Sequence, residues 1–238
     1  MSPRTAACAF ALVAFIFSQR AEAAERQAVV LLSSTTVLAR YERAMEGLRT
    51  PKIMRFEYAV EQVGPHNLSQ THRVYRSALD ERDEILSVDG QPLPMPSIRI
   101  IRDRVNRYNV VTLAPRLRDY DFTYVGTHRD GAVIDYVFKT APHAESAGAY
   151  QVVGVAIEGV HFLPRLIAYS TVSGDVRGHG TLTFWRQDKY WVVAQATASV
   201  RIAGKIARER LTFHNYDFPA SLPNSTFSEP RGLSTPIR

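Results

Sequence analysis

The side chains most used in catalysis and metal binding are present in this 238-residue sequence, but their spacing matches no catalytic or metal-binding motif. The histidines do not form an H-E-x-x-H pair or another ligand spacing, and no G-x-S-x-G segment marks a nucleophilic serine. The seven histidines are His66, His72, His128, His143, His161, His179 and His214. We therefore expect a protein that is not an enzyme, with no catalytic residue, bound metal or cofactor, and we keep a hydrolase as an alternative.

Two other polar segments have simple structural interpretations. The segment SGDVRGHG, residues 173–180, contains three glycines but lacks the Lys-Ser/Thr pair of a phosphate-binding loop, so it predicts a hairpin turn. Asp80, Glu81, Asp83 and Glu84 crowd around Arg82 in a predicted turn. We expect these carboxylates to be solvated.

Arginine is concentrated in the segment SIRIIRDRVNRYNVVTLAPRLRD, where Asp103 and Asp119 are the acidic residues. Guanidinium groups pair well with phosphate, so the segment predicts contact with lipid headgroups, a membrane surface or an acidic partner. A solvated strand face and loop is the alternative. A second basic group, Arg201, Lys205, Arg208 and Arg210, lies near a predicted turn and allows the same two interpretations. The residues of the first cluster are Arg99, Arg102, Arg104, Arg107, Arg116 and Arg118.

The N-terminus has the features of a secretory signal peptide. Arg4 precedes the apolar run Ala6–Phe17, and Ala21-Glu22-Ala23 provides an A-x-A cleavage site. The single cysteine, Cys8, lies inside this leader. We expect cleavage near Ala23 and a periplasmic mature chain without disulfide or thiol chemistry, with an uncleaved membrane anchor as the alternative.

The charge balance favours an anionic partner. The chain carries 29 Lys and Arg against 23 Asp and Glu, with a pI near 9.6. Export makes nucleic acid an unsuitable partner and favours lipid, an acylated protein or an anionic membrane surface. We expect a monomer.

A regular apolar stripe opens the mature domain. In PKIMRFEYAVEQ, residues 51–62, Met54, Phe56, Tyr58 and Val60 alternate with polar or small residues, which predicts a strand with one face out of water. Burying four such side chains contributes roughly 8 kcal/mol, at about 2 kcal/mol each. This face needs a cover, which is either the core of the protein or a ligand.

The surrounding elements follow from periodicity. Helical spacing of apolar residues predicts an amphipathic helix over 35–48. The prolines of DGQPLPMP, residues 89–96, predict a mobile loop, and HRDG at 128–131 predicts a hairpin. Strands are predicted at 53–62, 69–77, 83–88, 98–112 in one or two pieces, 120–126, 132–139, 150–157, 165–172, 181–186, 190–202 and 205–214.

About eleven antiparallel strands with one helix before them indicate a mainly β fold, a half-open antiparallel barrel with the helix as its lid. We expect a signal peptide at 1–23, one domain at 24–227 and a disordered tail at 228–238. Many large side chains face inward and only one predicted helix can cover them, which favours a partly unfilled interior. An ordinary packed core is the alternative. Other inward positions are Val153, Val155, Ile157, Leu182 and Phe184, and the predicted cavity-lining residues are Met54, Phe56, Tyr58, Val60, Phe122, Tyr124, Ile134, Tyr136 and Phe138.

The order of these segments resembles a known superfamily. The helix Val37–Leu48, MRFEYAVEQ, RVYRSALDERDEI, YDFTYVGTHRDGAVIDYVFKTAP and TLTFWRQDKYWVVAQATASVRIAGK together resemble the periplasmic outer-membrane lipoprotein carriers, LolA/LolB-like proteins, and the related RseB-like regulators. The resemblance covers roughly residues 35–218. It implies a half-open barrel of about eleven strands, lidded by helices, with an apolar cavity for acyl chains.

The resemblance has two departures. The Gly-rich strand pair of the carriers, with its following Pro- and aromatic-containing strand, has no clear match. The arginine that tethers the lid in the carriers has no assigned counterpart here, since Arg73, Arg76 and Arg82 are all candidates. The resemblance thus implies a non-catalytic carrier of lipid or lipoprotein, or alternatively a sensing module that binds a protein partner. In a carrier, the helix at 35–48 and the loop at 91–96 are expected to gate the cavity.

Overall fold

The computed structural model describes residues 31–102, 109–131, 133–144, 150–173, 176–202 and 205–228. The chain divides into two compact units, residues 1–33 and 34–238, and the fold below is that of the second unit. The predicted signal peptide, and the predicted tail apart from Ser228, lie outside the described residues.

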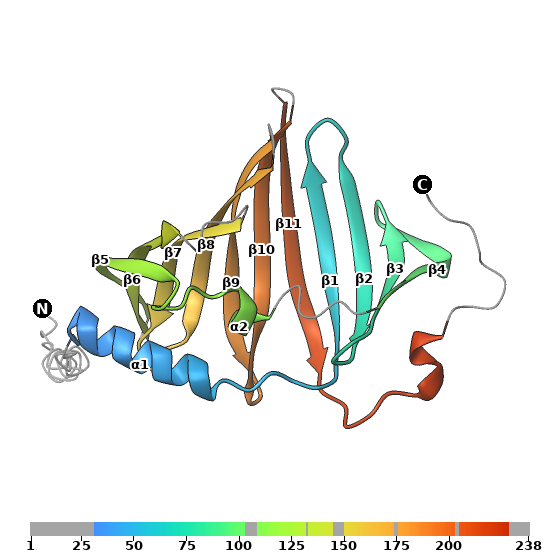
Figure 1. Cartoon of the computed structure of the whole chain (residues 1–238). Helices are drawn as coiled ribbons and strands as arrows, with labels where there is room; N and C mark the ends of the chain where they lie inside the picture. Colours follow the sequence, from blue (N-terminus) through green and yellow to red (C-terminus); the bar gives the residue numbers. More distant parts are fainter. Residues whose placement is uncertain are drawn as a thin grey trace, which may run out of the picture. The chain divides into compact units, whose positions relative to one another are not determined.

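A single antiparallel sheet of eleven strands forms the fold, in the order β4-β3-β2-β1-β11-β10-β9-β8-β7-β6-β5 (Figure 1). The sheet is open, because β4 and β5 are its two edges and do not pair with each other. This confirms the predicted mainly β fold with one helix before the sheet. The strands are β1 Met54–Val63, β2 Leu68–Arg76, β3 Glu81–Val88, β4 Gln91–Ile101, β5 Tyr120–Asp130, β6 Val133–Pro142, β7 Tyr150–Glu158, β8 Pro164–Ser173, β9 Val176–Gln187, β10 Tyr190–Ile202 and β11 Lys205–Asp217.

Two hairpin meanders meet in the middle of the sheet. Strands β1–β4 form one and β5–β11 the other, and the pairing of β1 with β11 joins them. The register aligns buried side chains across the seam and along one face, called here the inner face. A cross-strand row of this face contains Val60, Leu211, Ala196, Leu182, Ile167, Val155 and Phe138, all of them buried.

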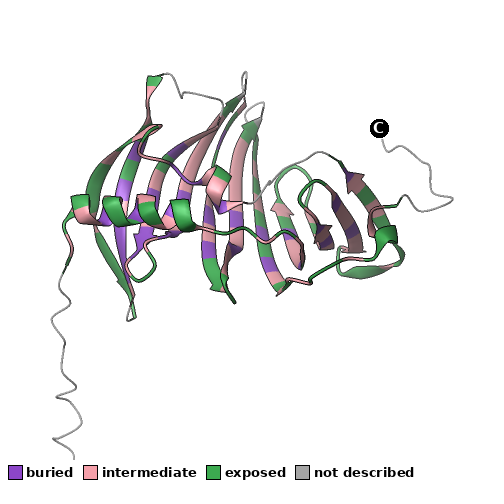
Figure 2. Cartoon of the chain, turned by 60° about the horizontal axis from the view of Figure 1, so that its bottom comes forward, coloured by how far each residue is buried: buried purple, intermediate pink, exposed green. Residues whose placement is uncertain are grey.

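The helix α1, Ser34–Gly47, covers the inner face of the β5–β9 part of the sheet (Figure 2). Its buried residues Val37, Tyr41 and Met45 recur at helical spacing, as the sequence predicted. The Tyr41 ring lies 6.0 Å from that of Phe122, and its hydroxyl donates a 2.6 Å hydrogen bond to the Pro115 carbonyl. This half of the sheet therefore has a filled core.

Two predictions for residues 89–112 are wrong. The proline-rich segment belongs to the edge strand β4 instead of a mobile loop, and a tight turn at Asp89 and Gly90, both with positive φ, connects it to β3. Proline lacks an N–H donor and is tolerated on an edge strand, especially where the register is irregular, as it is between Ile85 and Ser87 of β3. Residues 110–113 form the short helix α2, Val110–Leu113, and not a strand, because the Asn109 side chain caps Val111 N–H at 3.0 Å.

The predicted inward position of Val153 is also wrong. A bulge in the pairing of β7 with β8, between Val152 and Gly154, shifts the alternation by one residue. Val152 and Val155 are buried, whereas Val153 is 43% exposed. The other inward predictions beyond the cavity set, Ile157, Leu182 and Phe184, are buried.

Two glycines predicted to form a turn lie inside β9. A Cβ on Gly180 would stand 2.0 Å from the Thr197 carbonyl oxygen and 2.5 Å from the Tyr169 hydroxyl. That hydroxyl crosses the strand to donate a 3.0 Å hydrogen bond to the same carbonyl. Gly178 is restricted in the same way by the Thr171 hydroxyl at 2.7 Å. Only a residue without a side chain fits where the sheet and the Tyr169 ring approach so closely.

Candidate functional site

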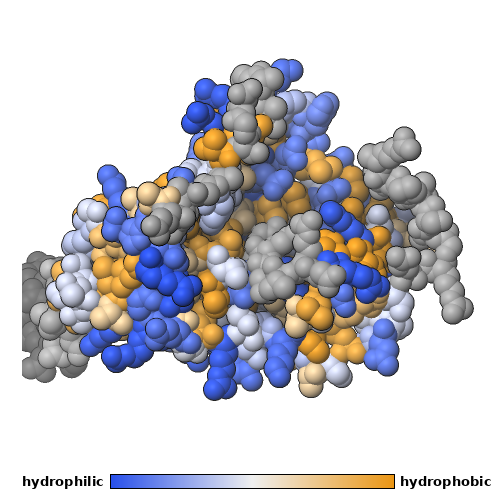
Figure 3. Space-filling model, viewed as in Figure 1, coloured by the Kyte–Doolittle hydropathy of each residue, from blue (hydrophilic) through white to orange (hydrophobic). Residues whose placement is uncertain are grey.

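A cavity of about 280 Å³ lies where the starts of β1 and β10 meet the ends of β2 and β11. The segment that links α1 to β1 and the N-cap residue of α2 complete its wall. Its position is outside the part of the sheet that α1 covers, and apolar surface is visible over β1–β3 in the space-filling view (Figure 3). The lining residues are Thr50, Pro51, Lys52, Met54, Phe56, Arg76, Ser77, Ala78, Asn109, Trp191, Val192, Val193 and Tyr216.

Aromatic side chains hold the apolar wall of this cavity in place. The rings of Phe56 and Tyr216 stack with their centroids 5.2 Å apart, and the Tyr216 hydroxyl donates a 2.8 Å hydrogen bond to the Val193 carbonyl. Trp191 Nε1 donates a 2.7 Å hydrogen bond to the Pro164 carbonyl. The wall is therefore formed by rings whose polar atoms are already satisfied, which suits contact with hydrocarbon.

The one buried cation of the cavity wall is compensated within the described chain. Arg76 Nε donates a 2.9 Å hydrogen bond to Glu81 Oε2, and Arg76 Nη2 pairs with the same oxygen. Both side chains are buried, and the guanidinium carbon stands 5.9 Å from the Phe56 ring centroid. A charge neutralised in this way can be buried beside an apolar cavity without a ligand.

Basic side chains lie where this cavity adjoins a second hollow. Thr50 and Lys52 also line a neighbouring shallow hollow, together with Arg49 and Lys189. The Lys189 ammonium lies 5.3 Å from the Tyr190 ring centroid. Among the described residues that line the two depressions, none is acidic. A cavity wall with aromatic rings on one side and cations where it adjoins the second hollow matches an amphiphile with an anionic head.

Next to this cavity, the inner face carries a partly buried polar cluster that the sequence analysis did not predict. The Tyr58 hydroxyl donates a 3.0 Å hydrogen bond to Asp83 Oδ2, and His72 Nδ1 lies 2.8 Å from Asp83 Oδ1. The rings of Tyr58 and His72 stack at 4.4 Å. Tyr58 and His72 are direct partners in the β1–β2 register. The alternation of side chains along the two strands was therefore the sequence signal that could have placed them on the same face. The three groups bind one another, which favours a structural role.

The predicted cavity-lining residues separate into two groups. Met54 and Phe56 line the cavity, and Tyr58 and Val60 follow them on the inner face of β1. The other five lie in the half that α1 covers: Phe122 packs against Tyr41, Tyr124 is 44% exposed, and the buried residues are Ile134, Tyr136 and Phe138. The cavity residues that the sequence did not indicate include Trp191 and Val193 of β10 and Tyr216 of β11.

The first arginine cluster does not form one surface within the described residues. Arg99 lies exposed on β4, and Arg102 pairs with Asp80 at 3.5 Å. Arg116 and Arg118 precede β5, at the opposite edge of the sheet. Arg104 and Arg107 lie outside the described residues.

Arg116 has a structural contact. Its guanidinium binds Glu42 of α1 through Nη2 at 2.7 Å and through Nε at 3.0 Å. This hydrogen bonding raises the pKa of Arg116 above its ordinary value, against the effect of partial burial. Arg118 is highly exposed and lies 3.2 Å from Asp119. Of the cluster, Arg99 and Arg118 are therefore the described residues most available to an external partner.

The described residues contain no group of three His, Cys, Asp or Glu side chains placed to hold a metal ion. In the same part of the chain, no helix combines the length and the apolar character needed to span a bilayer.

Comparison with models of protein families gives no match, and neither does comparison with curated proteins. Among solved structures, the chain resembles a LolA superfamily protein from Nitrosomonas europaea, at 12% identity and a TM-score of 0.41, over 84% of this chain and 99% of that one. It also resembles a DUF1329 family protein from Desulfovibrio piger, at 14% identity and a TM-score of 0.45, over 80% and 96% of the two chains.

A third similar structure is described as an outer membrane lipoprotein-sorting protein domain, from Vibrio parahaemolyticus. It is 12% identical with a TM-score of 0.43, over 82% of this chain and 97% of that domain. The resemblance to the lipoprotein-carrier superfamily stated from the sequence is thus also found among solved structures. All three TM-scores are below 0.5, so the function is argued below from the residues of this chain.

Proposed function

We propose that the chain is a non-catalytic periplasmic protein that binds an acyl chain carrying an anionic head, as a free lipid or as part of an acylated protein. The observation that carries this proposal is the cavity walled in part by Phe56, Trp191 and Tyr216, with Lys52 in its lining. The hydrocarbon end fits among the rings, and the head fits the basic side chains Arg49, Lys52 and Lys189.

The size of the cavity favours partial insertion of the ligand. A volume of about 280 Å³ is close to the lower end of the roughly 300–1,000 Å³ typical of small-molecule sites. Each methylene buried contributes about 0.8 kcal/mol, so a partly inserted chain binds less tightly than a fully enclosed one. Moderate affinity suits a protein that receives a ligand and passes it on.

The test combines native mass spectrometry of the mature form, starting near Ala24, with uptake of a fluorescent fatty acid. Met54→Trp fills part of the cavity and is expected to weaken uptake at least about tenfold. The matched control is Tyr124→Trp, which enlarges a predicted site residue that the structure places outside the cavity. Circular dichroism establishes that both variants are folded.

The role of the basic side chains is tested by the double variant Lys52→Glu with Lys189→Glu. We expect it to weaken binding of the fatty acid more than binding of its uncharged methyl ester, because only the acid has a head that the cations attract. Ligand-free protein without fatty-acid uptake, or equal losses for Met54→Trp and Tyr124→Trp, contradicts the proposal. A stoichiometric protein partner recovered without lipid would favour the sensing module.

A further inference from the structure

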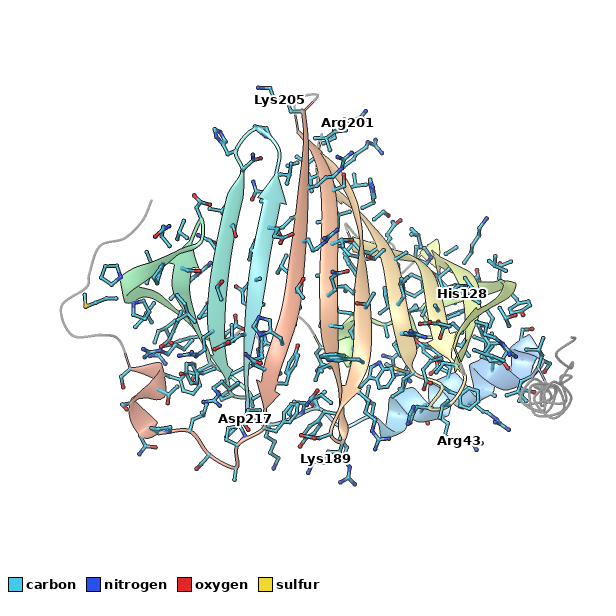
Figure 4. All side chains as sticks on the ribbon, turned by 180° about the vertical axis from the view of Figure 1, so that it is seen from behind. Arg43, His128, Lys189, Arg201, Lys205 and Asp217 are labelled. Carbon is cyan, nitrogen blue, oxygen red and sulfur yellow. The ribbon has the colours of Figure 1, made fainter. Side chains whose placement is uncertain are left out.

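At the end of the sheet opposite the cavity, cations and exposed aliphatic side chains gather on the ends of five strands. Figure 4 shows Arg201 and Lys205 at the tip of β10 and β11, and Lys189 at the other end of β10. We call this group the apical surface. Its cations are Arg177, Arg201, Lys205 and Arg208, and its aliphatic residues are Val63, Val172 and Ile206.

The register places the two kinds of residue side by side. Arg201 is the cross-strand partner of Ile206, Arg208 is the partner of Val63, and Arg177 is the partner of Val172. All four cations are exposed. The exposed fractions of the aliphatic side chains are 61% for Val63, 45% for Val172 and 43% for Ile206. Each exposed aliphatic residue therefore has a guanidinium beside it.

Among the described residues, the cations of the apical surface form no ion pair. No salt bridge within 4.0 Å joins any of its four cations to an acid among the described residues, and the nearby Glu61 lies 4.0 Å from Arg210 instead. Arg177 and Arg201 are direct partners in the β9–β10 pairing. Like charges in opposing positions destabilise a sheet, and an external anion removes that repulsion.

We propose that the apical surface docks onto the surface of an anionic lipid bilayer. The cations match anionic headgroups, and each Lys or Arg near such a surface strengthens binding about fivefold. The interleaved aliphatic residues match the boundary between headgroups and acyl chains, where Arg side chains extend toward phosphate while short aliphatic groups enter. A purely polar polyanion would leave these aliphatic residues in water, which is why a bilayer is the favoured partner.

This inference is independent of the proposed function, because the two sites are separate. Trp191, in the cavity wall, and Arg201 are ten positions apart on β10, which corresponds to about 33 Å at roughly 3.3 Å per residue. A chain docked through its apical surface has the cavity far from the headgroups it contacts. Vesicle binding and fatty-acid uptake can therefore fail separately.

Flotation with lipid vesicles tests the inference, using the mature form that starts near Ala24. We expect the protein to bind vesicles of phosphatidylcholine mixed with phosphatidylglycerol, and not vesicles of phosphatidylcholine alone. The variant with Arg177, Arg201 and Arg208 each changed to Gln should partition roughly 100-fold less strongly, since three cations are lost. Changing Val63, Val172 and Ile206 to Ser should weaken binding at high salt, where the electrostatic contribution is screened.

The matched control changes Arg43, Arg129 and Lys139 to Gln, which removes the same charge from exposed positions elsewhere. Vesicle binding within about threefold of the wild type is expected for this control. Equal losses in the control and the apical variant would overturn the proposal, because net charge alone would then explain binding. Equal binding to soluble polyglutamate, unaffected by the Ser substitutions, would instead identify an acidic polymer as the partner. Absence of binding to the mixed vesicles would also overturn the proposal.

Discussion

At the scale of single residues, Glu57 shows how the outer face of the sheet is held together around the seam. Its carboxylate accepts 2.9 Å hydrogen bonds from Arg73 Nε on β2 and from Asn215 Nδ2 on β11. Partial burial by itself raises the pKa of Glu57, but the hydrogen bonds from Asn215 and Arg73 outweigh burial, so the pKa lies below its ordinary value. One carboxylate on β1 thus contacts both neighbouring strands.

We predict that Glu57→Gln lowers the free energy of unfolding by up to about 1 kcal/mol at neutral pH, as expected of a partly exposed ion pair. Folding lowers the pKa of Glu57, so the ionised carboxylate stabilises the folded state. This stabilisation is complete above the pKa of glutamate in the unfolded chain, about 4.3, and is lost as pH falls through the lower pKa of the folded state. Urea denaturation at a series of pH values measures the difference.

The control for this prediction is Glu61→Gln, on the same strand, whose carboxylate is exposed and 4.0 Å from Arg210. This substitution should change stability less at every pH. A Glu57→Gln deficit that persists unchanged into strong acid would show that the effect is not the loss of the ionised carboxylate.

Some of the residues that line the cavity could be predicted from the sequence and others could not. Met54 and Phe56 could be assigned to a cavity because alternation on one strand places them on one face. Trp191, Val193 and Tyr216 could not, because their approach to Phe56 depends on strand order and on a bulge at Val193/Gln195. Such long-range pairing is not encoded in local periodicity.

At the scale of elements, β9 depends on the absence of a side chain at Gly180. We predict that Gly180→Ala destabilises the protein by about 3 kcal/mol, at the upper end of the usual effect of overpacking, since the new Cβ meets backbone at 2.0 Å. Gly154→Ala is the matched control, because the nearest atom to its Cβ, the Phe138 carbonyl oxygen, is 3.4 Å away. Thermal denaturation compares them, and equal stability of the two variants contradicts the prediction.

Local chemistry determines some element boundaries, and tertiary contacts determine others. The helix α1 was predicted within a residue at each end, because its spacing and its flanking Ser and Gly residues are local signals. The glycines of β9 were interpreted as a turn and the prolines of β4 as a loop, although both lie in strands. Tertiary contacts explain both strands. The Tyr169 ring that crosses β9 requires glycine there, and β4 tolerates proline because it is an edge strand.

At the scale of the whole molecule, the cover of the sheet is uneven. The sequence predicted one helix over a large apolar face, and the structure places that helix over the β5–β9 part alone. That part is filled, whereas the cavity of about 280 Å³ lies near the seam. The position of the helix could not be predicted, because it depends on contacts such as Tyr41 with Pro115, 74 residues apart in sequence.

We predict that the seam forms late in folding. Pairing of β1 with β11 joins residues such as Glu57 and Asn215, 158 positions apart, whereas β7 and β8 are neighbours in sequence. Leu211→Ala should therefore mainly accelerate unfolding, while Ile167→Ala should mainly slow folding, at a similar loss of stability for these two buried residues. Stopped-flow fluorescence of Trp185 and Trp191 measures both rates, and equal slowing of folding by the two variants contradicts the prediction.

The junction between the first and last strands has a consequence for the growing polypeptide. Until β11 has been synthesised, β1 has no neighbour on one side, and β10 likewise ends in unpaired backbone. A nascent or truncated chain thus exposes two strand edges with unpaired backbone groups. The aromatic side chains of β1 are exposed at the same time. Such a chain is prone to aggregate until β11 pairs with β1 and β10, or until another protein covers these segments.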